Sequence, residues 1–131
     1  MNKQLVFVYG TLRKNQRNHH FLRNASCIVR ECWTVGELYD SNLGYPFLVT
    51  VLSGRVSGEL YQVDDIQLES LDHLEGYTGS AETNYYDRIE QLVKTDLGSF
   101  RALVYVLPSG KQTGNMERIE SGDWCMYLGQ C

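Results

Sequence analysis

The sequence predicts an α+β fold: a small mixed barrel, or a strongly curled mixed sheet, with a few short flanking helices. Six runs rich in apolar, β-branched and aromatic residues predict strands, and 131 residues is a usual size for one domain. So many strands in so small a domain favour closure into a barrel. The runs cover residues 4–9, 27–39, 46–52, 56–63, 85–94 and 100–107.

Turn signals separate these runs along the chain. The long run 27–39 has room for a bulge, and the polar, glycine-containing stretch 40–44 ends it. Residues 52–55 and 97–99 each place a glycine between two apolar runs, which predicts a hairpin at each position. No repeat, low-complexity tract or linker divides the chain, so we expect one domain over residues 1–131.

Helical patterns are fewer than strand patterns. One helix is predicted over residues 14–23 and a short one over 121–128. The strongest pattern covers 64–75, because one of two adjacent aspartates can cap its first turn and Gly76 can end it. The apolar face of this helix is formed by Leu68, Leu71 and Leu74.

The charge of the chain is unevenly distributed. The net charge of -4 argues against a nucleic-acid-binding protein, which needs a basic face. Residues 1–30 carry six Lys or Arg and no carboxylate, while the rest of the chain carries all 16 acids. This basic end either attracts a small anionic ligand or is a solvated helix face.

The sequence favours a cytoplasmic protein that does not interact with a membrane. No segment is apolar and long enough to span a bilayer, and the first residues lack a hydrophobic signal region. In a reducing compartment the cysteines are expected to be free thiols, with Cys27 and Cys32 at least half-buried in strands. The four cysteines are Cys27, Cys32, Cys125 and Cys131.

The stretch Tyr9-Gly10-Thr11-Leu12 follows the first predicted strand directly. Gly10 allows unusual backbone angles and close approach of a ligand to the main chain. Thr11 can cap a following helix, or offer its hydroxyl and amide to an anion. The pattern therefore predicts either a site for a carboxylate or carbonyl oxygen, or an ordinary strand-ending turn.

Glu75 is the candidate catalytic acid. Its spacing from Leu68 and Leu71 places it on the inward face of the predicted helix, in the last turn where the helix dipole is negative. Both conditions disfavour the ionised form and raise the pKa of a carboxyl group, as general acid–base catalysis requires. The alternative is a side chain that only reaches out from the edge of the core.

Common catalytic motifs are missing from this sequence. It contains no Gly-x-Ser-x-Gly elbow, no phosphate-binding Gly-Lys-Ser/Thr loop and no His-Glu-x-x-His. The neighbouring His19 and His20 point to different faces of any regular element and lack a third ligand at metal spacing, while His73 lies on the polar side of its helix. We therefore expect no metal site.

Several segments, in order along the chain, form a recognisable set: Val6–Lys14 with Asn18-His19, Tyr45-Pro46, Val56–Asp64, Leu71–Tyr77, Tyr85–Arg88 and, more loosely, Ala102–Val106. Together they resemble the γ-glutamylcyclotransferase-like family, most of all its γ-glutamylamine cyclotransferase branch with bacterial and plant relatives. The resemblance covers residues 5–107 and leaves 108–131 as a variable tail expected to pack on the barrel.

The resemblance implies a mixed barrel with flanking helices, a substrate-binding loop from Tyr9 to Leu12, and Glu75 as acid and base. It implies release of 5-oxoproline and an amine from γ-glutamyl amines or peptides, because the substrate's own α-amine attacks its γ-carbonyl. Such a reaction needs no metal, cofactor or protein nucleophile, so the expected partner is a small γ-glutamyl molecule. The oligomeric state is not predicted.

Other residues are weaker candidates for the site. Tyr86, Arg88 and Tyr105 could contact the substrate, although Tyr86 and Tyr105 could equally pack in strands and Arg88 could pair with Asp87 or Glu90. Tyr9 could lie under the substrate or hydrogen-bond to Glu75. Glu82 is a rival acid, but it lies in a predicted exposed loop.

Two other functions remain open from sequence. One is a non-catalytic module that binds an amino-acid derivative in the same pocket. The other is a biosynthetic enzyme that removes a γ-glutamyl protecting group by the same chemistry, with a different leaving amine. The loops 40–47 and 77–85 are expected to form the mouth of the pocket and to select that amine.

Overall fold

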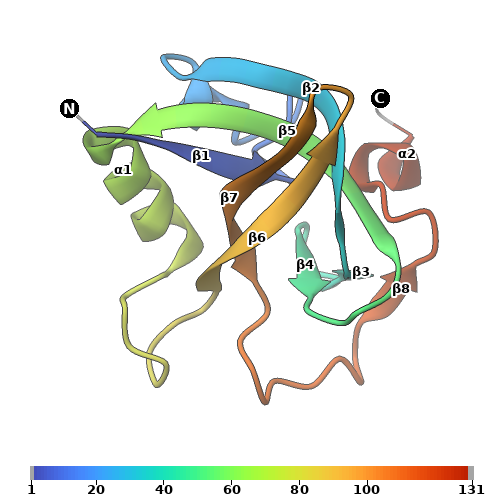
Figure 1. Ribbon diagram of the computed structural model, residues 1–131. Coiled ribbons are helices and arrows are strands. Elements are labelled where there is room, and N and C mark those ends of the chain that lie inside the picture. The colour runs from blue at the N-terminus through green and yellow to red at the C-terminus, as the bar shows by residue number, and fades with distance from the viewer. Residues whose placement is uncertain (1, 130–131) are drawn as a thin grey trace.

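A computed structural model describes residues 2–129. The main part of the fold is a closed barrel of five strands (Figure 1). Around the barrel the order is β1 (Lys3–Val8), β5 (Arg55–Asp64), β2 (Ser26–Val35), β6 (Asp87–Thr95) and β7 (Gly98–Val106). The β1–β7 pairing, with Val6 opposite Leu103, is parallel, and the other four are antiparallel. The predicted mixed barrel is therefore confirmed.

A second sheet takes strands that the sequence pattern assigned to the barrel. It has the order β4 (Pro46–Val49), β3 (Glu37–Asp40) and β8 (Glu117–Ile119). The predicted strand 27–39 shows the expected irregularity, with register shifts between Cys27 and Cys32, but it is interrupted at Gly36. Gly36 has φ 151°, a conformation that favours glycine, and there the chain leaves the barrel.

One of the two predicted hairpins is wrong. The β6–β7 hairpin forms around residues 95–98 as expected. Residues 52–55 do not join a hairpin, because β4 ends at Val49 and pairs with β3 rather than with β5. The polar stretch 40–44 instead forms the β3–β4 turn. A turn signal predicts a change of direction, and it does not determine which strand the next segment pairs with.

Helix α1 (Asp65–Glu75) confirms the strongest helix prediction. Asp64 accepts a hydrogen bond from the Gln67 N–H, and the Gln67 side chain accepts one from the Asp64 N–H, so both hydrogen bonds of a capping box are present. Gly76 ends the helix in the left-handed conformation, with φ 69°. Both ends of the helix that carries Glu75 are therefore fixed by local sequence.

The other two helix predictions need correction. Residues 14–23 form turns and a single 3-10 helix, η1 (His19–Leu22), and Asn15 has a positive φ of 71° that interrupts any continuous helix. Helix α2 (Trp124–Leu128) is shorter than the predicted 121–128, because Asp123 caps it only from that point. A chain that turns repeatedly can fold back over the barrel end, and this is how residues 10–18 reach the site.

Strand β1 separates two hydrophobic cores. Phe7 and Tyr9 belong to a core that includes residues from all five barrel strands. Val6 and Val8 point the opposite way, into a core shared with Leu68 and other residues of α1. Both faces of β1 are thus buried, and its C-terminal end is held where the barrel, α1 and the second sheet meet.

The described cysteines differ in their exposure. Cys32 is buried, as expected, and its thiol contacts the Gly58 carbonyl oxygen. Cys27 is exposed, contrary to the prediction, because it lies at the irregular start of β2. Cys125 is buried in α2, and Cys131 lies outside the described residues. Among residues 2–129, the helices are too short or too polar to cross a bilayer.

Candidate active site

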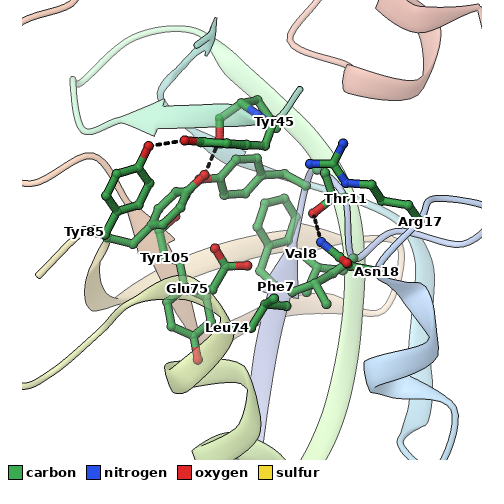
Figure 2. Close-up of a pocket in the computed structure, with 15 residues that line it drawn as sticks. Phe7, Val8, Thr11, Arg17, Asn18, Tyr45, Leu74, Glu75, Tyr85 and Tyr105 are labelled. Carbon is green, nitrogen blue, oxygen red and sulfur yellow. Dashed lines mark hydrogen bonds between the residues drawn. The ribbon is translucent and has the colours of Figure 1, made fainter. Parts of the chain in front are cut away.

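A cavity of about 240 Å³ opens where the loop after β1 meets the start of β4, the end of α1, the residues just before β6 and the end of β7 (Figure 2). It brings together the predicted loop Tyr9–Leu12, the predicted acid Glu75 and two of the three weaker candidates, Tyr86 and Tyr105. The remaining lining residues are Phe7, Val8, Arg17, Asn18, Tyr45, Pro46, Leu74 and Tyr85.

Gly10 is required here because another chain segment packs against it. A Cβ atom at this position would lie 2.8 Å from both Cγ and Cδ of Pro46, which is closer than such atoms approach. Gly10 is not among the residues with positive φ, so the backbone freedom that glycine allows is not used here. The match of Gly10 with Pro46 instead lets the β4 end of the second sheet close over the loop.

The loop exposes main-chain donors. Its carbonyl oxygens are used, since Gly10 accepts from the Arg13 N–H at 3.1 Å and Thr11 accepts from the Asn18 N–H at 2.9 Å. The Thr11 hydroxyl accepts from the Asn18 amide at 2.9 Å and caps no helix. Within residues 2–129, the N–H groups of Gly10, Thr11 and Leu12 donate no hydrogen bond. They are available to an anionic or carbonyl oxygen in the cavity.

A buried carboxylate holds this loop from below. Glu59 on β5 is 5% exposed and accepts from the Lys14 N–H at 2.9 Å and from the Tyr61 hydroxyl at 2.8 Å. Its second oxygen pairs with Nε of Arg13 at 3.1 Å, and Nη1 of Arg13 also reaches Asp123 at 3.0 Å. Sequence reasoning missed Glu59, although a lone carboxylate in the apolar run 56–63 was a visible signal.

Glu75 is the last residue of α1, and its carboxyl group points into the cavity (Figure 2). No hydrogen bond or ion pair holds this carboxyl group within the part of the chain that the structure describes. Burial raises the pKa of Glu75 to about 7, since the ionised form loses hydration without gaining a partner. A carboxyl group half-protonated near neutral pH can accept a proton and return it.

The tyrosine rings form the wall of the cavity, and their hydroxyls are engaged elsewhere. The Tyr9 hydroxyl donates to the Tyr105 carbonyl at 2.7 Å and accepts from the Leu48 N–H at 3.0 Å, so the suggested bond to Glu75 is wrong. The Tyr86 hydroxyl donates to the Pro46 carbonyl at 2.7 Å. The Tyr105 hydroxyl donates to Asp72 at 2.7 Å. Tyr86 and Tyr105 thus contact the cavity with ring faces and edges.

Arg88 does not line the cavity, which corrects its selection as a possible substrate-binding residue. Its guanidinium pairs with Asp72 of α1 and lies 4.6 Å from the centre of the Tyr77 ring. The alternative partners were wrong as well, because Glu90 pairs with Arg101. The partner of Arg88 is therefore a residue of α1 that is distant in sequence. The Arg88–Asp72 pair holds α1 one turn before Glu75.

The mouth of the cavity contains residues from both predicted mouth loops. The Tyr45 and Tyr85 hydroxyls hydrogen-bond to each other across it (Figure 2), and burial raises the pKa of Tyr45 to about 12. Glu82 lies exposed in the 77–85 loop, away from the lining, so Glu75 is the acid in the cavity. Sequence reasoning counted Arg17 only as one of six basic residues near the loop, and its own place at the cavity was not predicted.

The histidines contact the main chain. Nδ1 of His19 lies 3.0 Å from the Leu12 carbonyl, and Nδ1 of His20 lies 3.1 Å from the Arg17 carbonyl. His73 is exposed on α1. Within residues 2–129, no three His, Cys, Asp or Glu side chains are grouped so that they could hold a metal ion.

Comparison with known proteins gives one family. The profile described as gamma-glutamyl cyclotransferase, AIG2-like, matches residues 6–126. The gamma-L-glutamyl-butirosin B gamma-glutamyl cyclotransferase of Niallia circulans is 38% identical over 102 residues, which cover 77% of this chain and 65% of that protein. The gamma-glutamylcyclotransferase family protein YtfP of Escherichia coli K12 is 38% identical over 120 residues, covering 91% of this chain and 94% of YtfP.

A solved structure has the same fold. The crystal structure of YkqA from Bacillus subtilis matches with a TM-score of 0.77 and 32% identity, over 99% of this chain and 44% of YkqA. This chain therefore spans a little under two thirds of the butirosin relative and less than half of YkqA. The match to YkqA extends over the barrel, the second sheet and the helices of the described chain.

Proposed function

Since this chain belongs to the gamma-glutamyl cyclotransferase, AIG2-like family, we propose that it is an enzyme that releases 5-oxoproline and a free amine from γ-glutamyl amines or short γ-glutamyl peptides. One observation carries the proposal. The unpaired carboxyl group of Glu75 and the uncommitted N–H groups of Gly10, Thr11 and Leu12 line the same small cavity.

The reaction is an internal aminolysis of the substrate. The substrate's α-amine nitrogen bonds to its γ-carbonyl carbon, the bond from that carbon to the leaving nitrogen breaks, and a five-membered ring results. Glu75 takes one proton from the α-ammonium group and delivers it to the departing nitrogen. The ring nitrogen loses a second proton after the attack, and this proton passes to the released amine, which leaves as an ammonium ion, so no proton is gained or lost overall. Holding the two ends of the substrate at attack distance can contribute roughly 7–11 kcal/mol in favourable cases.

The loop N–H groups complete the chemistry. As the α-amine attacks, negative charge develops on the carbonyl oxygen, and a well-placed donor stabilises it by roughly 3–4 kcal/mol. The same donors can bind the α-carboxylate of the glutamyl group. The rings of Tyr86 and Tyr105 exclude water that would otherwise hydrolyse the amide, because their hydroxyls are bonded to other groups.

A second candidate differs only in the leaving amine. The Niallia circulans relative, whose name gives γ-L-glutamyl-butirosin B as its substrate, is 38% identical to this chain. That identity supports a role in removing a γ-glutamyl group from a biosynthetic intermediate. The resemblance of residues 6–14 and 71–77 to the γ-glutamylamine branch supports simpler amines as leaving groups.

The test is a direct assay of product. The purified protein is incubated with a panel of γ-glutamyl amines and γ-glutamyl dipeptides, and 5-oxoproline is measured by chromatography alongside the released amine. We expect the two products in equal amounts. Binding of these compounds without any 5-oxoproline would contradict the proposal and favour a non-catalytic binding module.

A further inference from the structure

The cavity has a single cationic side chain among its described lining residues, Arg17. Arg17 lies in the turns between β1 and η1, on the opposite side of the cavity from Tyr85 (Figure 2). Within residues 2–129 it makes no ion pair with a carboxylate. An exposed guanidinium at the mouth of a substrate cavity is therefore free to pair with a bound molecule.

The other basic residues of the N-terminal segment do not compete for this role. Arg13 is committed to Glu59 and Asp123 beneath the loop. The rest are exposed and lie outside the cavity lining; they are Lys3, Lys14, Arg23 and Arg30. Among the described basic residues up to position 30, Arg17 is thus the one that lines the cavity.

Arg17 also lines a neighbouring surface hollow. This hollow shares Thr11 and Arg17 with the cavity and continues along Asp40, Asn42 and Gly44. A Cβ atom at Gly44 would lie 3.0 Å from Nη1 of Arg17, so the guanidinium rests against the β3–β4 turn. Arg17 therefore stands between the interior of the cavity and a route along the surface.

Asp40, the carboxylate in that hollow, already accepts two hydrogen bonds. One Asp40 oxygen accepts from the Asn42 N–H at 2.8 Å and the other from the Tyr127 hydroxyl at 2.8 Å. Both donors are neutral, so Asp40 keeps its negative charge, but within residues 2–129 it forms no ion pair with Arg17. At the mouth itself the guanidinium of Arg17 presents a positive charge with hydrogen-bond donors, which favours a carboxylate over an ammonium group.

The size of the cavity directs the leaving amine toward Arg17. At about 240 Å³ it is smaller than the roughly 300–1,000 Å³ of ordinary ligand pockets, so it fits a glutamyl group and little more. With the glutamyl group between the loop and Glu75, the rest of the bound substrate extends out through the mouth of the cavity. This placement rests on the proposed function.

We propose that Arg17 binds a free carboxylate on the leaving amine, so that the substrates of this chain are γ-glutamyl amino acids and short γ-glutamyl peptides with a free C-terminus. The planar guanidinium offers two parallel N–H donors to such a carboxylate. Leaving amines that carry a positive charge near this point are disfavoured. Because Arg17 is exposed, the preference amounts to about tenfold in kcat/KM, or about 1.4 kcal/mol.

The test uses two substrates that differ by one carboxylate. γ-Glutamyl-alanine and γ-glutamyl-ethylamine have leaving groups of the same skeleton, with and without that carboxylate. We expect the wild-type protein to prefer γ-glutamyl-alanine about tenfold in kcat/KM, mainly through KM. In Arg17→Gln the ratio of the two kcat/KM values should fall close to one.

A matched variant controls for the loss of charge. Arg23→Gln removes the same charge from an exposed residue outside the cavity lining, and it should keep the wild-type preference. Thermal unfolding checks that both variants fold. An equal fall in kcat/KM for both substrates in Arg17→Gln would overturn the proposal, since Arg17 would then bind the glutamyl part. No preference between the two substrates in the wild-type protein would overturn it as well, since Arg17 would then bind neither carboxylate.

Failure of the proposed function gives a different result. If neither compound yields 5-oxoproline, calorimetric dissociation constants for the two compounds still test Arg17. A tenfold tighter binding of γ-glutamyl-alanine that disappears in Arg17→Gln would support the carboxylate site without catalysis. Equal binding of the two compounds would overturn it.

Discussion

Two carboxylates face the loop after β1 from different regions, and their surroundings differ sharply. Glu59 lies below the loop and accepts from the Arg13 side chain, the Lys14 N–H and the Tyr61 hydroxyl. Glu75 lies in the cavity, has no such donor among the described residues, and has its pKa raised to about 7 by burial. Donors make a buried carboxylate a structural group, whereas their absence leaves it available for proton transfer.

The largest effect expected from this contrast is on turnover. Glu75→Gln keeps the size of the side chain and removes its ability to carry a proton, so kcat should fall roughly 100- to 10,000-fold. Substrate should still bind, because the loop N–H groups are unchanged. Single-turnover formation of 5-oxoproline and calorimetric binding of a γ-glutamyl dipeptide measure the two quantities.

Glu82→Gln is the matched control for that variant. Glu82 is exposed and lies outside the cavity, so this change should alter kcat less than twofold. Activity retained by Glu75→Gln, or lost in Glu82→Gln, would show that the acid had been assigned to the wrong residue.

Glu59 should show the opposite behaviour, with its main effect on stability. Glu59→Ala removes one carboxylate partner from the largely buried Arg13, which keeps Asp123, and leaves the Lys14 N–H without an acceptor. Removing one member of such a buried pair costs about 3–5 kcal/mol. Urea unfolding at pH 7 should show this loss for Glu59→Ala but not for Glu75→Gln. Equal stability of the two variants would remove the distinction between the carboxylates.

The pH dependence of stability tests the state of Glu75. Its pKa is about 7 in the folded protein, against an ordinary value of 4.5, so the folded state binds the proton more tightly. Stability from this group is therefore present below pH 4.5 and is lost as pH rises to about 7. The full difference amounts to about 3 kcal/mol.

The measurement compares the wild-type protein with Glu75→Gln. Gln does not titrate, so the variant should gain stability relative to the wild-type protein between pH 4.5 and pH 8 in urea unfolding. On the catalytic side, kcat/KM of the wild-type protein should rise with pH through about 7 as Glu75 becomes a base. A constant stability difference across this range would mean that the carboxyl group is solvated.

The parts of the fold that could be predicted from sequence depend on local signals. Helix α1 was predicted because a capping aspartate and Gly76 lie at its two ends, and its leucine spacing also placed Glu75 inward. The second sheet was missed because the departure of the chain at Gly36 depends on packing against β4. Strand β8 has three residues, too few to show a pattern.

The residues of the candidate site also fall into those predicted from local patterns and those that depend on distant segments. The loop after β1 and Glu75 were predicted from patterns of adjacent residues. The individual roles of Glu59 and Arg17 were not predicted, because each depends on a partner or cavity formed by distant segments. Tyr45 was predicted only as part of a mouth loop, and its contact with Tyr85 was not. Arg88 was misplaced for the same reason, since its partner Asp72 is on α1 rather than on its own strand.

Arg88 provides the smallest expected effect. It pairs with Asp72 at partial exposure and touches no part of the cavity, so Arg88→Gln should reduce the free energy of unfolding by about 1 kcal/mol. KM for γ-glutamyl substrates should change less than threefold, because Glu75 is held mainly by the capped helix. Urea unfolding and steady-state kinetics measure both. A tenfold rise in KM without loss of stability would instead place Arg88 in contact with the substrate and the cavity boundary further along β6.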